Sequence, residues 1–255
     1  MDSAQIILLA LVSFFSWFFS ILLGGGCPLL LIPVISLFLG LEAVAPVLTL
    51  GLLMGNAQRL FLFKQDVDFS SSRWFLPGSI VGALIGAWLL KFIHLEGLQF
   101  VLGGTMLCLA LYCSMRKNKT SWTFQSWHFL PIAFVNAIGS SLVGSTGSLM
   151  NPMYLNYGLQ KESFIATKSL HTSGLHLVKV LSYLAFGSFH PDYFVYGGVI
   201  GLASFPANWL GKFCLARMTA GAFAQAVLVL MAVSGTWMLW EQRSWMIALT
   251  HGGAA

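Results

Sequence analysis

The chain has 255 residues, of which 57% are hydrophobic and 8% are charged. Soluble domains carry about 25% charged residues, so this composition excludes a soluble globular protein and predicts an integral membrane protein. The net charge of +5 would suggest nucleic-acid binding in a soluble protein, but here the basic residues stand mostly in short loops, as orientation in a bilayer requires. We therefore expect a lipid bilayer, and no nucleic acid, as a partner.

The apolar runs predict an all-α, polytopic membrane bundle of ten segments. In chain order they cover residues 5–23, 28–40, 42–63, 74–93, 96–115, 127–143, 148–158, 160–187, 192–213 and 218–240. A helix needs about 20 residues to cross the hydrocarbon, and the second and seventh runs are too short to span comfortably. The first run has no basic leader and no cleavage site, so we expect a retained helix rather than a signal peptide.

An internal repeat relates the first five segments to the last five. Ordered breaks and loops that match together indicate a repeat more strongly than one matching helix does. The matched positions are Trp88 with Trp209, Lys91 with Lys212, Gly25 with Gly144, Pro33 with Pro152 and Thr49 with Thr167. We predict two membrane repeats, each with a short or broken half-helix, at 1–115 and 127–243. A hydrophilic, cytoplasmic linker at 116–126 joins them, and a tail follows at 244–255.

The basic loop residues favour one topology. If each half crosses five times, the loop bases between Lys64 and Arg217 fall on one face, except Lys91, and that face is cytoplasmic. If the short segments dip in and return instead, the charges divide more evenly. The excess of basic residues on one face therefore favours ten passages, inverted halves and both termini outside. Whether segments 28–40 and 148–158 fully cross the membrane or re-enter stays open.

No pattern in the chain indicates a metal, a nucleotide or a redox cofactor. The four cysteines, Cys27, Cys108, Cys113 and Cys214, show neither CxxC pairing nor histidines at metal-ligand spacing. We expect them to pack as small apolar residues, with only Cys27 placed to line a cavity. Walker, haem and HExxH motifs are absent from the sequence, so neither a cofactor nor an enzymatic activity is expected.

Charged residues inside the segments are candidates for function, because burial of a charge in hydrocarbon is costly. All eight carboxylates lie at or beyond segment ends, whereas three bases, Arg59, Lys168 and Lys179, lie inside. A cation carrier would place a carboxylate near the midplane, and an anion carrier needs donors and positive potential there. The pattern predicts an anionic substrate. Arg59 and Lys179 lie within about two turns of a segment end, so snorkelling to the headgroups is the alternative for both.

A polar stripe runs along one face of segment 160–187. Lys168, His171, Thr172 and Lys179 follow the spacing of one helical face. Lys168 lies about 12 Å along the axis from the start of the segment, near the middle of the membrane, and we predict that it is the principal anion contact. His171 would bind the substrate, take up a proton or bond a backbone carbonyl. His176 is the second candidate for proton coupling, and the two histidines point too far apart to bind a metal.

Two breaks supply the second element of a site. The motifs GGGCP and GSTGS interrupt their helices, since glycine lacks a Cβ and proline lacks a donor, and they leave new helix N-termini at about Pro28 and Ser148. Free N–H groups and the positive end of the helix dipole attract anions there. The candidate binding residues are Gly25, Gly26, Cys27, Ser145, Thr146, Ser148 and Asn151 at the breaks, with Thr49 and Asn56 on segment 42–63. Close helix packing is the alternative for isolated glycines such as Gly82 and Gly86.

The motifs GGGCPLLLIP, APVLTLGLL, KQDVDF and GSIVGALIGAWLL, with their counterparts in the second half, resemble the sulfite exporter TauE/SafE family. The resemblance covers essentially the whole chain. It implies secondary transport of sulfite, thiosulfate or an organosulfonate across the bacterial inner membrane. In that membrane, the outside termini that the basic residues favour would be periplasmic. GSTGS and Cys27-Pro28 stand where the family commonly has more glycine, so the pocket lining differs. The Lys168 stripe follows from spacing and not from the resemblance.

We therefore expect an alternating-access carrier that holds a small anion between two opposed breaks. A passive anion channel is the first alternative. An intramembrane enzyme is the second, and it lacks an embedded carboxylate to orient a histidine. The residues leave open the particular anion, the direction of transport, the coupling ion and whether the protein forms a homo-oligomer.

Overall fold

The computed structural model describes residues 3–89, 104–105, 107–112, 124–143, 145–187 and 189–241, and this part of the chain contains only helices, turns and connections. The helices are α1 (Ser3–Leu22), α2 (Cys27–Leu39), α3 (Leu41–Leu62), α4 (Phe69–Leu89), α6 (Phe129–Val143), α7 (Asn151–Tyr157), α8 (Lys161–Ala185), α9 (Asp192–Arg217) and α10 (Ala220–Glu241), with short 3-10 helices η1 (Lys64–Asp66) and η2 (Ser126–His128). The predicted all-α fold is confirmed for these residues. Most of segment 96–115, most of the linker and the tail 244–255 lie outside them.

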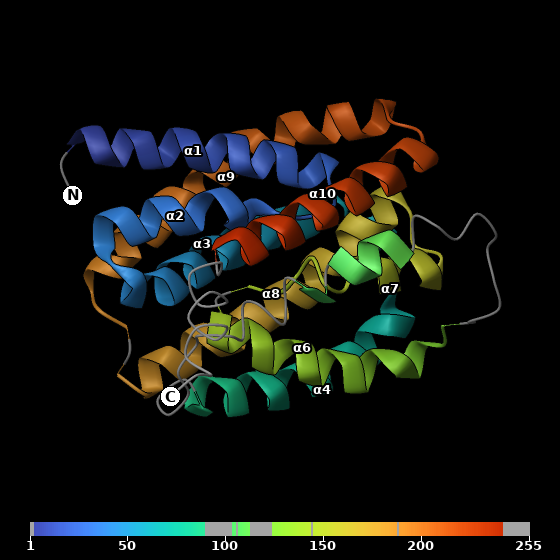
Figure 1. The fold of residues 1–255 in the computed structure, drawn as a ribbon, viewed down its shortest axis with the longest axis horizontal. Helices are drawn as coiled ribbons and strands as arrows, with labels where there is room; N and C mark the ends of the chain where they lie inside the picture. Colours follow the sequence, from blue (N-terminus) through green and yellow to red (C-terminus); the bar gives the residue numbers. More distant parts are fainter. Residues whose placement is uncertain are drawn as a thin grey trace, which may run out of the picture.

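The helices lie side by side, with α1 and α9 along one edge of the bundle, α4 and α6 along the opposite edge and α8 between them (Figure 1). The principal contacts join α1 to α9, α3 to α8 and α9, and α4 to α6 and α8. If the two halves correspond, α1 matches α6, α3 matches α8 and α4 matches α9. The α1–α9 contact then corresponds to the α6–α4 contact, and the α3–α9 contact corresponds to the α8–α4 contact. The helices of the two halves are therefore paired in a matching way.

The outer surface of the bundle is apolar. Within the part of the chain that the structure describes, three helices are long and apolar enough to cross a membrane, namely Ser3–Leu22, Asp192–Arg217 and Ala220–Trp237. Large side chains on several helices are about half exposed or more, including Phe19, Leu37, Phe61, Val135 and Trp209. Soluble monomers rarely expose apolar patches of this extent. Together with the composition, the surface identifies a multi-pass membrane protein.

Helix α4 begins at Phe69, earlier than the predicted start at 74, because Asp68 caps it. The Asp68 carboxylate accepts hydrogen bonds from the backbone amides of Ser71 (2.9 Å) and Ser70 (3.4 Å), which is the role of an N-cap residue. Burial raises the pKa of Asp68, but the hydrogen bonds from Ser71 and Ser70 outweigh it and hold the pKa below its usual value. The Asp68 amide donates to Thr167 Oγ1 at 2.9 Å, which ties this loop to α8.

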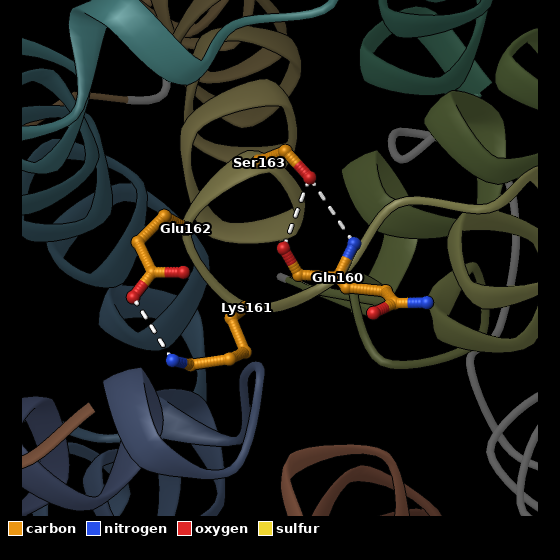
Figure 2. Close-up of polar contacts among 4 residues, drawn as sticks. All are labelled: Gln160, Lys161, Glu162 and Ser163. Atoms are coloured by element: carbon orange, nitrogen blue, oxygen red, sulfur yellow. Dashed lines mark hydrogen bonds and ion pairs between the residues drawn. The ribbon is translucent and has the colours of Figure 1, made fainter. Parts of the chain in front are cut away.

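A side-chain cap fixes the start of α8 (Figure 2). The backbone amide of Gln160 donates to Ser163 Oγ at 3.1 Å, and the Ser163 hydroxyl donates to the backbone carbonyl of Gln160 at 2.9 Å. Beside them, Lys161 Nζ lies 3.4 Å from Glu162 Oε1 in an ion pair. The cap sets the first residue of α8 one position after the predicted start, and the position of every later side chain along the helix follows from it.

Close packing explains the glycines of α4. A Cβ at Gly82 would overlap the carbonyl oxygen of Phe134, and a Cβ at Gly86 would lie 2.8 Å from the carbonyl oxygen of Ile138. The backbones of α4 and α6 therefore touch, in the manner of small-residue interfaces in membranes. For these two glycines the packing alternative is the one that the structure supports.

Candidate functional site

A small cavity lies where the two breaks meet α3 and α8. Its volume is about 50 Å³. A polar cavity of this volume is large enough to hold water. This is the size of a small ion rather than of an organic metabolite.

Most of the predicted binding residues meet at this cavity. Those that line it are Gly25, Gly26 and Cys27 in the first break, Ser145 and Ser148 in the second, Asn56 on α3, and Lys168 and Thr172 on α8. Four do not line it, namely Thr49, Thr146, Asn151 and His171. The cavity is also lined by residues that were not predicted as binding residues, notably Trp17 and Ser20 on α1, Arg59 on α3 and Ser169 on α8.

The first break is a run of three glycines with positive φ between α1 and α2. The φ angles of Gly24, Gly25 and Gly26 are 67°, 149° and 90°, which residues with a Cβ rarely adopt. Helix α2 starts at Cys27 with Pro28 in its first turn, where proline is well tolerated. The first amides of α2 have no partner within the helix and stand at the positive end of its dipole, next to the cavity.

The second break differs from the prediction, because α7 begins at Asn151 and not near Ser148. Residues 147–150 form a turn, and Pro152 sits in the first turn of α7, which is where proline starts a helix. The Thr146 hydroxyl donates to Asn136 Oδ1 at 2.9 Å, so it is directed to α6 and away from the cavity. With seven residues, α7 has little dipole, and the second break contributes side chains instead.

Lys168 joins the two breaks. Its Nζ atom donates to the Gly24 carbonyl at 2.6 Å and to Asn151 Oδ1 at 2.5 Å, and it lies 5.6 Å from the ring centre of Phe164. A single side chain of α8 thus holds the first break against the start of α7. Asn151 does not line the cavity, but it fixes the amine that does.

Arg59 is the second base at the cavity, and it does not snorkel to the membrane surface. Its guanidinium donates to Asn208 Oδ1 (2.6 Å), Ser20 Oγ (3.3 Å) and the Trp17 carbonyl (2.9 Å), and it lies 4.6 Å from the centre of the Trp17 ring. Only 4% of its surface is exposed. Arg59 therefore presents a fixed positive charge to the cavity.

Two buried donors near the cavity have no hydrogen-bond partner within the described part of the chain. They are the indole Nε1 of Trp17, which lines the cavity, and Nδ2 of Asn151, which lies 3.9 Å from the Cβ position of Gly25. A buried unpaired donor costs about 1–3 kcal/mol, and water or an anion in the cavity would offer these atoms an acceptor. No carboxylate is among the described residues that line the cavity. The arrangement suits an anion.

His171 belongs to a separate hydrogen-bond chain. Its Nδ1 lies 2.9 Å from Tyr154 Oη and its Nε2 lies 2.9 Å from Ser72 Oγ, while the Ser72 hydroxyl donates to the Asp68 carbonyl at 2.7 Å. Because the Ser72 proton is used, Nε2 must donate and Nδ1 must accept from Tyr154. The ring stacks on Phe75, with the ring centres 4.0 Å apart. His171 thus connects α7 to α4 instead of facing the cavity.

The predicted stripe divides because neighbouring positions on a helix point about 100° apart. Lys168 and Thr172 face the cavity, His171 turns toward α4 and α7, and His176 and Lys179 lie farther along α8. Lys179 Nζ donates to the carbonyl and the hydroxyl of Ser140 on α6 at 2.8 and 3.4 Å, so it too is buried rather than snorkelled. Among the residues that the structure describes, no group of three His, Cys, Asp or Glu side chains could hold a metal.

We expect His171→Phe to lower stability and to leave anion affinity almost unchanged. The phenyl ring keeps the stacking on Phe75 but leaves the buried Tyr154 hydroxyl without its acceptor, which costs about 1–3 kcal/mol, whereas the Ser72 hydroxyl keeps its hydrogen bond to the Asp68 carbonyl. Thermal unfolding in detergent should shift down by several degrees, while calorimetric anion affinity changes less than about threefold, which is below 1.4 kcal/mol. His190→Phe, at an exposed histidine, is the matched control. A large loss of affinity at full stability would place His171 in the binding site after all.

Gly25→Ala should weaken anion binding about tenfold or more, equivalent to about 1.4 kcal/mol. The added Cβ would lie 2.9 Å from Lys168 Nζ, and the φ of 149° is unfavourable for alanine. Gly147→Ala is the control in the same cavity, since its Cβ would make ordinary contacts at 3.8 Å with Ser145 and 3.9 Å with Lys168. Titration calorimetry on both variants, with melting temperatures alongside, checks the prediction. Equal affinities for the two variants would contradict it.

Comparison with protein families adds an independent finding. A family model described as "Sulfite exporter TauE/SafE" matches residues 9–238, a range that contains both breaks and every residue of the cavity. Neither a curated protein nor a solved structure matches the chain.

Proposed function

The chain belongs to the sulfite exporter TauE/SafE family, and from this we propose that it is a secondary transporter for a small sulfur-containing oxyanion. The family implies export of sulfite or a related sulfur anion, and a transporter rather than an enzyme. We further propose that the protein lies in a bacterial inner membrane and works by alternating access.

The observation that carries the proposal is the set of donors around the cavity. Two fixed bases, Arg59 and Lys168, line it, and the unpaired donors of Trp17 and Asn151 lie in or beside its wall. A trigonal or tetrahedral oxyanion has enough lone pairs to accept from all of them at once. Its charge would also offset that of the two bases, which form no ion pair with the carboxylates that the structure describes.

The size of the cavity supports a choice among sulfur anions. A cavity of about 50 Å³ suits a small anion such as sulfite or thiosulfate, whereas an organosulfonate would need the walls to move. We therefore expect affinity to fall in the order sulfite or thiosulfate, then methanesulfonate, then larger sulfonates.

Alternating access is supported by the matching pairs of helices and by a matching pair of buried bases. Arg59 on α3 contacts Ser20 on α1, and Lys179 on α8 contacts Ser140 on α6. In both cases base and serine are 39 positions apart in the chain. We propose that the two halves are inverted repeats with both termini periplasmic, as the distribution of basic loop residues favours. Lys168, which binds both breaks, would then connect anion binding to their relative movement.

The test is transport by the purified protein in liposomes. Uptake of labelled sulfite, thiosulfate, sulfate and methanesulfonate is measured with and without a pH gradient. Saturable counterflow of a sulfur oxyanion is the expected result. Single-channel currents without counterflow would replace the carrier by a passive channel, and failure of every anion to bind or move would overturn the proposal.

A further inference from the structure

We infer that the transported anion has a second set of contacts, made by Thr49, His176 and Lys179, which bind it in the opposite-facing state of the carrier. This inference rests on the proposed transport function. It assigns a binding role to three residues that line neither the cavity nor the surface pocket described below.

Two separate hollows follow the α3–α8 interface from one end of the bundle. An outer pocket of about 250 Å³ opens where residues 61–66, at the end of α3 and in η1, meet Glu162 at the start of α8. The two helices therefore run in opposite directions along the interface. The cavity follows deeper along the same helices, between Arg59 and Leu52 on α3 and between Ile165 and Thr172 on α8.

The same helical faces continue beyond the cavity. Thr49 is three residues from Leu52, and His176 is four residues from Thr172, so each lies on the face that lines the cavity. Lys179 follows His176 by three residues. All three side chains are buried, with exposed fractions of 0% for Thr49, 1% for His176 and 0% for Lys179. Neither the cavity nor the outer pocket reaches them.

Buried polar atoms in this region have unmet hydrogen-bonding requirements. Nδ1 of His176 is buried and has no partner within the described residues, and the same holds for Oγ of Ser173 one turn earlier. Such atoms are uncommon in native structures and need an explanation. A state in which an anion or its water reaches this part of α8 supplies one.

The residues around Lys179 are the counterparts of those around Arg59. The two base–serine contacts align the two halves of the chain. In this alignment Arg59 corresponds to Lys179, and Ser20 corresponds to Ser140. This register pairs Asn56 with His176 and Thr49 with Ser169. The repeat predicted from the sequence pairs Thr49 with Thr167, so the two registers differ by two residues. Each of these polar residues in the cavity therefore has a polar counterpart in the closed region.

Exchange of conformation between two inverted halves follows directly from this correspondence. In the state described, the cavity is lined by Arg59, Asn56 and Ser169. The counterpart region, with Lys179, His176 and Thr49, is closely packed. When the halves exchange their arrangements, the second side opens and the first closes, while Lys168 and Thr172 remain between them. The anion would pass from one fixed base to the other.

Paired cysteine probes test the inference. Ser169→Cys and Thr49→Cys are made separately in a protein whose native cysteines are replaced by serine or alanine, and each is exposed in liposomes to a membrane-impermeant methanethiosulfonate reagent from either side. We expect the two probes to react from opposite sides, and saturating methanesulfonate, which does not consume the reagent, to slow both reactions. Reaction from the same side, or no reaction at Thr49→Cys while transport continues, would overturn the inference.

A functional readout separates a binding role of Lys179 from a purely structural one. Lys179→Met should lower the maximal transport rate at least tenfold and change equilibrium sulfite affinity less than threefold, because Arg59 and Lys168 still bind the anion in the present state. Unchanged transport would contradict the role. If the parent protein moves no anion, the transport proposal fails, whereas opposite-sided labelling without transport would leave the two-sided route intact.

Discussion

Replacing Lys168 with methionine should lower affinity for the transported anion about 100-fold, which corresponds to about 2.8 kcal/mol. The change removes one of two bases that line the cavity, and hydrogen bonds to charged groups contribute about 1.5–3 kcal/mol each. It also removes the link between the Gly24 carbonyl and Asn151, so the two breaks lose their shared contact. Equilibrium binding by calorimetry and counterflow in liposomes measure the two effects separately.

The control for this variant is Arg73→Met, which removes an exposed base of α4 that does not line the cavity. Its affinity should equal that of the parent protein. Lys168→Arg should not restore binding, because the Gly24 and Asn151 oxygens hold a compact ammonium group and arginine is larger and planar. Full affinity in the methionine variant would remove Lys168 from the site.

Arg59→Met should have the largest combined effect, since the side chain is both a wall of the cavity and a tie between helices. Its loss leaves the buried Asn208 Oδ1 without this donor, at a cost of about 1–3 kcal/mol. It also removes the hydrogen bond that the Trp17 carbonyl accepts from α3 in addition to its own helical bond. We expect a melting temperature lower by about 10 °C, since 1 kcal/mol shifts a chain of this size by about 2–4 °C, and an anion affinity at least tenfold weaker.

Arg59→Lys separates these two contributions. Lysine keeps the positive charge but cannot form three divergent hydrogen bonds in fixed geometry, so affinity should recover more than stability does. Arg217→Met, at an exposed base near the end of α9, is the control for both measurements. Full stability in Arg59→Met would show that the contacts to α1 and α9 contribute little.

Local signals in the sequence were sufficient to predict the helices and the breaks. Apolar runs and glycines are properties of neighbouring residues, so the bounds of α1, α2, α3 and α8 agree with prediction within a few positions. The start of α4 was missed because a capping carboxylate, Asp68, made a polar stretch helical. The sequence predicts a helix start near Ser148, but residues 147–150 form a turn and α7 begins at Asn151.

The cavity could be predicted only in part, because side-chain direction depends on distant neighbours. Spacing found Lys168, but it could not distinguish Thr172 from His171, whose partners come from α4 and α7. Arg59 was recognised as an embedded base, yet its burial depends on Asn208, 149 positions away. Trp17 gave no signal, since nothing local marks an indole N–H that will have no partner.

No carboxylate is among the described residues of the cavity wall, and this has a consequence for the energetics of a transport cycle. Arg59 and Lys168 belong to the helices and stay in the protein, so each anion that crosses would carry its own negative charge across the bilayer. A membrane that is negative inside drives such a charge outward by about 2.3 kcal/mol per unit charge at 100 mV. For an anion that crosses without a co-transported proton or sodium ion, the resting potential alone would then favour export.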